Sequence, residues 1–296
     1  MNWDWIYRGE TRQLDDAARS AAGGSFIQLS RGCTHYELAG PDSSEPVVLI
    51  HGFSVPYFIW DVTFEALTAA GKRVLRYDLF GRGYSDRPHA AYSLDLFEDQ
   101  LGELLAALHF EHVNLIGLSM GGAIAAGFTV KRPERVDRLV LIDPIGTEAM
   151  PLNLLYKTAL LPGVSELALS LLGTEKMVES LASDFFDPAE VERFKERYRA
   201  QMQFRGFKRA ILSTLRNKTV NGFPAIYRQL GQLSTPVLLL WGRQDRTLPV
   251  EQSQSILRAV PRADFHIIED SGHIPNCEQP EVVNPMLLEF LNRNDR

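Results

Sequence analysis

The polar residues that could perform acyl transfer in this sequence each follow a short apolar run. They are His51, Ser119, Asp245 and His273. A serine hydroxyl is a poor nucleophile at neutral pH and needs a base to accept its proton. An imidazole can accept and return that proton, and a carboxylate bonded to its other nitrogen fixes the tautomer. We therefore predict Ser119 as nucleophile, His273 as base and acid, and Asp245 as the orienting carboxylate.

Ser119 is the centre of a Gly-x-Ser-x-Gly pattern that runs from Gly117 to Gly121. An apolar, β-prone stretch precedes the pattern, and a small-residue stretch that favours a helix follows it. A strand, a tight turn and a helix in this order present the hydroxyl above the sheet edge, at the positive end of the helix. Glycine is expected at both flanks because side chains there would collide. The alternative is a serine in an ordinary turn.

Acyl transfer also needs hydrogen-bond donors where negative charge develops. We predict the backbone N–H groups of Met120 and Phe53 as the oxyanion hole, since they follow the nucleophile and an earlier strand. His51 is expected to brace that earlier loop, and Gly52 allows a close backbone approach. The residues expected to line the substrate pocket are Gly52, Tyr57, Leu118 and Leu155.

Asp143 is a rival for the orienting carboxylate, because it also follows an apolar strand. We favour Asp245, which lies several residues beyond Trp241 in a loop with reach. Pro144 directly follows Asp143, which suits a chain that turns away. For His273, the alternative is that it only caps the last helix.

Composition narrows the class of protein. The chain has 296 residues, 45% of them hydrophobic and 23% charged, as in an ordinary globular domain. A net charge of −6 argues against nucleic acid as the main partner. The two cysteines do not make a disulfide framework, and no secretory signal or membrane span is evident, so we expect a cytoplasmic protein. The histidines show no metal-ligand spacing, and we expect no metal and no cofactor.

Hydrophobic periodicity predicts an α/β fold with a mostly parallel sheet and helices on both faces. From 145 to 221 the alternation stops, and only helical patterns are found. We expect a core domain from 1–144 and 222–296 and an inserted helical cap from 145–221. The predicted strands are 26–30, 34–38, 47–50, 73–78, 113–117, 138–142, 237–241 and 265–268.

From about Phe26 to Leu291 the chain resembles the serine-nucleophile branch of the α/β-hydrolase superfamily. The resemblance rests on His51-Gly52-Phe53, on the Gly81-Arg82-Gly83-Tyr84-Ser85 loop, on Gly117 to Gly122, on Trp241 to Asp245 and on Gly272-His273. It implies a cofactor-independent carboxylesterase or monoacylglycerol-lipase-like enzyme that acts on a small-molecule ester through an acyl-enzyme.

Two other functions stay open. The meta-cleavage product hydrolases, which split carbon–carbon bonds, look similar around the nucleophile, but they usually carry Asn where this chain has Leu118. A non-catalytic member of the fold that binds a small molecule is the third hypothesis.

The expected cap suggests what the substrate and partners are. Its many leucines, among them Leu155, Leu160 and Leu169, favour a lipophilic acyl group or simply pack the cap on the core. Basic residues between 193 and 209 indicate a solvated helix face or, alternatively, weak contact with an anionic lipid interface. Cys277 is expected to be a buried apolar residue.

Overall fold

The strands of this chain form a single mixed sheet. The computed structural model describes residues 7–148 and 160–293, and its eight-stranded sheet has the order β1-β2-β4-β3-β5-β6-β7-β8. β1 is antiparallel to β2 and β2 to β4, whereas the pairs from β4 to β8 are parallel. This architecture confirms the predicted fold class. The strands are β1 (Ser25–Leu29), β2 (Gly32–Ala39), β3 (Pro46–Ile50), β4 (Arg73–Tyr77), β5 (Val113–Leu118), β6 (Val136–Ile142), β7 (Val237–Gly242) and β8 (Asp264–Ile268).

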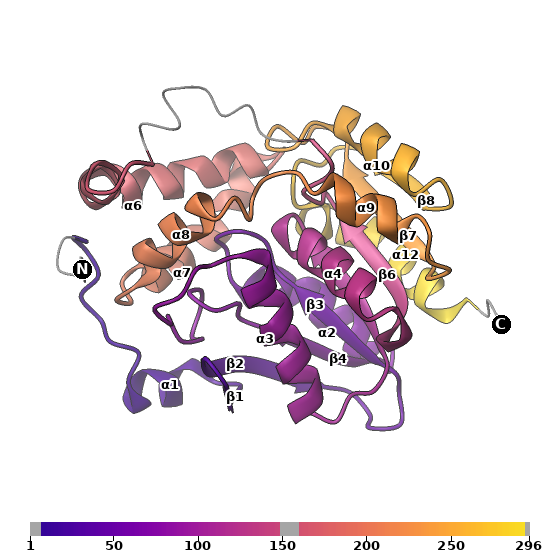
Figure 1. Cartoon of the computed structure of the whole chain (residues 1–296), viewed down its shortest axis with the longest axis horizontal. Coiled ribbons are helices and arrows are strands. Elements are labelled where there is room, and N and C mark those ends of the chain that lie inside the picture. The colour runs from indigo at the N-terminus through magenta and orange to yellow at the C-terminus, as the bar shows by residue number, and fades with distance from the viewer. Residues whose placement is uncertain (1–6, 149–159, 294–296) are drawn as a thin grey trace.

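Helices cover both faces of the sheet, as Figure 1 shows. In that view α3 (Leu94–Ala107), α4 (Met120–Lys131) and α9 (Pro224–Leu230) pass in front of the sheet. Behind it lie α2 (Asp61–Ala69) and α12 (Pro280–Asn292). The remaining helices that flank the sheet are α1 (Asp16–Ala22), α10 (Ser253–Ala259) and α11 (Pro275–Glu278), with 3-10 turns η2 (Tyr57–Trp60), η3 (Pro133–Arg135) and η5 (Val250–Gln252).

The apolar strands are buried because each face of the sheet has its own core. Successive side chains of a strand point to opposite faces. Leu115 therefore belongs to the cluster with α3 and α4, while Ile116 belongs to the cluster with α2 and α12. Leu239 and Leu238 on β7 divide in the same way. Full burial of such a side chain contributes about 2 kcal/mol to the free energy of unfolding. Because both faces of these strands are buried, each strand appears in the sequence as a continuous apolar run.

The segment between β6 and β7 is helical where the structure describes it. It holds α6 (Val164–Asp184), η4 (Pro188–Val191), α7 (Glu192–Met202) and α8 (Phe207–Arg216). α6 begins directly after Gly163, where the sequence has a Pro-Gly break. In Figure 1, α6, α7 and α8 lie together at one end of the molecule. The division into a core and a cap stays a prediction.

Three of the seven basic residues between 193 and 209 are paired with acids. Arg197 pairs with Asp61, and Lys195 and Arg199 pair with the acids Glu192 and Glu175. These pairs lower the free positive charge that a lipid surface would meet, and lipid contact stays a prediction. No helix within the described ranges is long and apolar enough to cross a membrane.

Candidate active site

Ser119 lies in a strained turn between β5 and α4. Its backbone has φ 54° and ψ −117°, and α4 begins at the next residue. The turn is tight enough to need glycine on both sides. A Cβ on Gly117 would lie 2.3 Å from the carbonyl oxygen of Gly121, and a Cβ on Gly121 would lie 2.1 Å from that of Ile50. The strained conformation is therefore held by its surroundings, as is common at functional sites.

His273 and Asp245 form a buried hydrogen-bonded pair. His273 Nδ1 donates to Asp245 Oδ2 at 2.7 Å. The other oxygen of Asp245 accepts the N–H groups of Thr247 and Leu248, each at 2.8 Å. With Nδ1 engaged by the carboxylate, Nε2 is the nitrogen left to act as a base toward Ser119. This is the geometry expected of the predicted orienting acid.

The electrostatics of the pair favour a protonated imidazole. Burial alone lowers the pKa of His273, but the charge and hydrogen bond of Asp245 and the charge of Asp184 outweigh it, and the net pKa is raised. Asp184 is the last residue of α6, and its carbonyl oxygen accepts the His273 N–H at 2.7 Å. The helical segment thus contacts the histidine through both a hydrogen bond and a charge.

Asp143, the rival carboxylate, lies beside the same pair. Its Oδ1 accepts the N–H of Gly242 at 2.9 Å. One side-chain ligand atom from each of Asp143, Asp245 and His273 falls within 4.8 Å of the other two. Burial, followed by the charge of Asp245, raises the pKa of Asp143 well above its usual range. Two adjacent carboxylates do not both ionise readily, so Asp143 ionises less readily here than an ordinary aspartate does.

The same three side chains would also satisfy the spacing of a metal site. Most of these ligand atoms are already occupied, because Asp245 uses both oxygens and His273 uses Nδ1 in the hydrogen bonds described above, while Asp143 Oδ2 has no hydrogen-bond partner among the described residues. A cation would have to break these bonds to bind. The donor set therefore fits a proton-transfer pair better than a metal centre.

A cavity of about 250 Å³ brings the predicted residues together. Ser119 and His273 line it, and so do Gly52, Phe53 and Leu118. Met120 is fully buried at the start of α4, where first-turn N–H groups have no partner within the helix. The oxyanion-hole roles of Met120 and Phe53 stay predictions.

Two of the residues predicted to line the substrate pocket are not found in the described lining of the cavity. Tyr57 is not among the residues that line the cavity, and this expectation is wrong. The Tyr57 ring lies edge-on to the His35 ring, with centroids 4.8 Å apart. The guanidinium of Arg76 lies over the Tyr57 ring in a cation–π contact. Residues 57–60 form the 3-10 turn η2, which turns the tyrosine toward β2 and β4. Leu155 lies outside the described residues.

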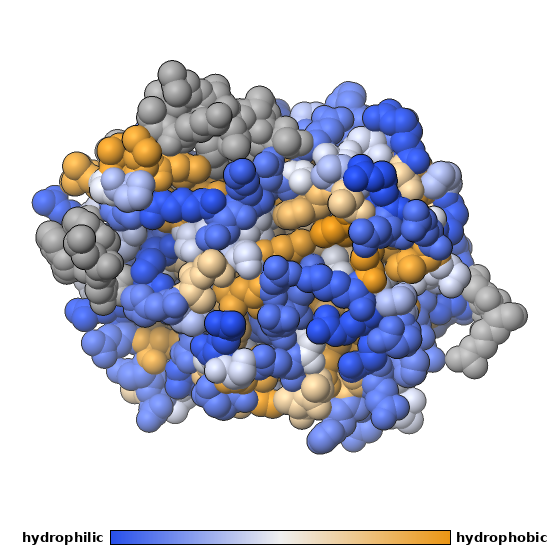
Figure 2. Space-filling view, viewed as in Figure 1, coloured by the Kyte–Doolittle hydropathy of each residue, from blue (hydrophilic) through white to orange (hydrophobic). Residues whose placement is uncertain are grey.

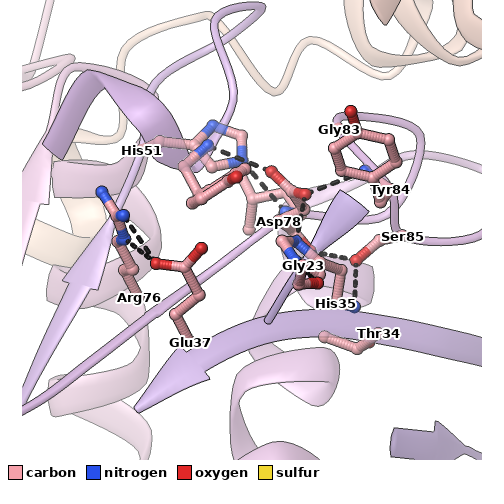
Figure 3. Close-up of polar contacts among 12 residues, drawn as sticks. Gly23, Thr34, His35, Glu37, His51, Arg76, Asp78, Gly83, Tyr84 and Ser85 are labelled. Carbon is pink, nitrogen blue, oxygen red and sulfur yellow. Dashed lines mark hydrogen bonds and ion pairs between the residues drawn. The ribbon is translucent and has the colours of Figure 1, made fainter. Parts of the chain in front are cut away.

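His51 braces the loop that carries Phe53, as the sequence suggests. Its Nδ1 donates to the Gly52 carbonyl at 2.9 Å, and its Nε2 accepts the Leu79 N–H at 3.0 Å. Burial lowers the pKa of His51 to about 4, so the ring stays neutral in this tautomer. Figure 3 shows His51 beside Asp78, which is bonded to His35 at 2.8 Å. This hydrogen-bonded network holds the loops that follow β3 and β4 in one arrangement.

Arg82 and Asp184 are functional candidates that the sequence analysis missed. Arg82 is fully buried, and its Nε donates to the carbonyl oxygen of Phe53 at 2.8 Å. Its Nη2 donates to Thr214 Oγ1 on α8, also at 2.8 Å. The glycine-rich motif around Arg82 was a visible signal, whereas nothing in the sequence around Asp184 marks it as part of the site.

Comparison with known proteins identifies a matching family and similar enzymes. The family model for the alpha/beta hydrolase fold matches residues 45–280. A 2-hydroxy-6-oxononadienedioate/2-hydroxy-6-oxononatrienedioate hydrolase of Klebsiella pneumoniae is 30% identical over 267 residues, which cover 85% of this chain and 88% of that protein.

Two solved structures extend the comparison. A meta-cleavage product hydrolase variant from Pseudomonas fluorescens IP01 superposes with a TM-score of 0.74 at 27% identity, covering 91% of this chain and 97% of its own. A thermophilic esterase from Thermogutta terrifontis superposes with a TM-score of 0.76 at 25% identity. The match covers 90% of this chain and 98% of the esterase chain. The similar proteins thus include enzymes named for different reactions.

Proposed function

This chain belongs to the α/β-hydrolase fold family, and from that premise we propose that it hydrolyses uncharged carboxylic esters through an acyl-enzyme. Hydrolase activity is what the family and the relatives support; the bond and the substrate are the proposal. The observation that carries it is the charge of the cavity. Among the described residues that line it, the titratable side chains are Asp184, Tyr198 and His273, and no lysine or arginine is present.

This charge pattern disfavours an anionic substrate. The relative from Klebsiella pneumoniae is named for a dioate, which carries two carboxylates. A carboxylate taken into this cavity would lose its hydration, meet no lysine or arginine among the described lining residues and lie near Asp184, at a cost of several kcal/mol. An ester without charge avoids that cost. A group that donates hydrogen bonds, such as a glyceryl hydroxyl, would also find an acceptor in Asp184.

The proposed mechanism follows from the hydrogen bonds of the site. Ser119 Oγ attacks the ester carbonyl while His273 accepts its proton, and Asp245 stabilises the imidazolium. The N–H groups of Met120 and Phe53 receive the developing oxyanion. His273 then returns the proton to the departing alcohol. A water molecule, deprotonated by His273, attacks the acyl-enzyme and releases the acid and the free serine.

Carbon–carbon bond hydrolysis is the second candidate, and the named relatives favour it over ester hydrolysis. Both the protein from Klebsiella pneumoniae and the one from Pseudomonas fluorescens carry such names. The same triad would act on a ketone carbonyl, with a carbon leaving group that accepts the proton. We rank this candidate second because Leu118 directly precedes the nucleophile and because the described lining of the cavity has no lysine or arginine.

A direct competition of substrates separates the candidates. Initial rates are measured for p-nitrophenyl acetate, butyrate and decanoate and for a 2-hydroxy-6-oxo-dienedioate, with wild type and Ser119→Ala. We expect kcat/KM for the best ester to exceed that for the dioate by at least tenfold, and Ser119→Ala to lose about 10⁶-fold in kcat. A preference for the dioate would establish the second candidate. Turnover of neither substrate would point to a non-catalytic binding protein.

A further inference from the structure

A second cavity, of about 360 Å³, lies between α6 and α8. We call it the α6–α8 groove. Its walls are mostly aliphatic and come from Leu160, Ala168, Leu169, Leu212 and Leu215. Met177 and Ser180 line both this groove and the cavity at Ser119. The two hollows therefore adjoin along the C-terminal half of α6.

We propose that the α6–α8 groove binds the hydrocarbon chain of an acyl ester whose carbonyl lies at Ser119. The inference rests on the proposed ester hydrolysis and names its substrate class, esters of medium to long saturated acids. Met177 lines both the cavity that holds Ser119 and the groove, so the chain would pass along that side chain. Methionine is well suited to such a position because its unbranched thioether adapts to different ligands.

The groove has the length and direction that an extended chain needs. The α6 residues that line it recur at helical spacing, from Ser180 through Gly173 to Ser165, and so form one stripe of the helix. Fifteen residues of helix span about 22 Å. The stripe starts at the active-site cavity and leads away from it, which is where a chain attached to the reacting carbonyl must go.

The far end of the groove is held by a polar clamp. Arg216 on α8 donates to Glu166 Oε1 on α6 at 2.8 Å and to the carbonyl oxygen of Leu160 at 3.1 Å. Burial raises the pKa of Glu166, but the bonds from Arg216 and from nearby groups outweigh it and lower the pKa to about 2. The pair is thus ionised at neutral pH. It fixes the separation of α6 and α8, so the groove exists before any ligand enters.

The other apolar face of α6 is a separate feature. Figure 2 shows hydrophobic side chains gathered at the α6 end of the molecule. Leu161, just before α6, and Leu167 and Leu171 on α6 are each more than half exposed, at 52%, 56% and 53%. None of these leucines lines the groove. This neighbouring face supplies a matched control, because the same substitution can be made inside or just outside the groove.

The test compares Ala168→Trp, which puts a ring into the groove, with Leu167→Trp, one residue away and outside it. Both positions are exposed, so both variants should fold, and thermal unfolding checks this. For wild type, kcat/KM should rise by up to about fourfold per methylene across the p-nitrophenyl series. In Ala168→Trp, the decanoate-to-acetate ratio should fall at least tenfold, while Leu167→Trp keeps it within twofold. Equal profiles for the two variants would overturn the proposal. Ala168→Leu provides a smaller obstruction if the tryptophan variant does not fold.

A second readout separates failure of the groove from failure of the proposed function. p-Nitrophenyl alkylphosphonates form a bond from serine Oγ to phosphorus, release p-nitrophenolate and need no acyl turnover. We expect the octyl reagent to label wild type faster than the ethyl reagent does, and this difference to disappear in Ala168→Trp. That result supports the groove even if no ester is hydrolysed. Ester turnover without any chain-length dependence leaves the proposed function standing and removes the groove. No labelling at all would remove both.

Discussion

Asp143 and Asp245 leave the sheet from different strands, yet they present side-chain oxygens within 4.8 Å of each other beside His273. Both are buried, and only Asp245 contacts the imidazole. Burial and the charge of Asp245 raise the pKa of Asp143 well above its usual range, so Asp143 holds a proton more readily than an ordinary aspartate does. The two residues that sequence reasoning treats as rivals therefore share one buried cluster, in which Asp245 makes the hydrogen bond to His273.

The different hydrogen-bond partners of Asp143 and Asp245 predict unequal effects of the same substitution at the two positions. Asp245→Asn removes the charge that orients His273, and kcat/KM should fall by about 10⁴-fold. Asp143→Asn keeps an oxygen that can accept from Gly242 and leaves the hydrogen bond between Asp245 and His273 in place, so kcat/KM should stay within about fivefold of wild type. Ester kinetics on both variants check this. A large loss in Asp143→Asn alone would identify Asp143 as the orienting acid.

The fall of kcat/KM at acid pH should follow the protonation of His273. Hydrolysis needs the neutral imidazole, and its pKa is raised above 6.5. The log of kcat/KM should therefore fall as pH drops through a midpoint above 6.5. Asp184→Asn removes one charge that raises this pKa, so the midpoint should move to lower pH. Profiles from pH 5 to 9 measure both midpoints, and Asp270→Asn, which alters a carboxylate outside the cavity lining, is the control. An unmoved midpoint in Asp184→Asn would rule out the charge contact.

Arg82 should affect turnover through the position of Phe53. Burial lowers the pKa of Arg82 to about 10, so its guanidinium remains charged at neutral pH. Arg82→Lys keeps a charge but cannot reach the carbonyls of Phe53 and Phe80 and the Thr214 hydroxyl together. We expect kcat to fall about tenfold to a hundredfold with little change in KM.

The control for Arg82 is Thr214→Val, which breaks one bond of the same guanidinium without touching Phe53. Thermal unfolding of both variants accompanies the kinetics. If both variants lose stability equally while kcat is unchanged, Arg82 is only a packing residue.

The tightness of the elbow predicts that glycine is indispensable at 117. A Cβ on Gly117 meets backbone atoms of Gly121, and backbone cannot move aside as a flexible side chain can. Gly117→Ala should cost about 3 kcal/mol or more and lower the midpoint of thermal unfolding accordingly.

Gly102→Ala on α3 is the matched control, because the nearest heavy atom to its Cβ would be 3.5 Å away. Alanine favours a helix over glycine, and the control should unfold at the same temperature as wild type or higher. A Gly117→Ala protein as stable as this control would contradict the elbow geometry.

Local patterns made much of this molecule predictable. The strands at 47–50, 113–117 and 237–241 read correctly because burial on both faces demands continuous apolar residues. The turn at Ser119 was predictable because its steric demand for glycine falls within five consecutive residues. In both cases the physical cause acts between chain neighbours.

Features that depend on distant segments were not predictable. Tyr57 was expected in the pocket, and its direction depends on how η2 packs against His35 and Arg76. Arg82 reaches Thr214, and Asp184 reaches His273, across 132 and 89 residues of chain. No periodicity or spacing in the sequence records such contacts.

The sequence by itself therefore determined the α/β architecture and the location of the tight turn that carries Ser119, since both follow from hydrophobic period and local sterics. The tertiary structure alone decided that Asp143 lies beside the pair of Asp245 and His273, and that Asp184 reaches the cavity, whose described lining has no lysine or arginine. These properties depend on distance and burial. Coulombic energies and desolvation vary with the positions of groups in space, which the order of residues along the chain does not specify.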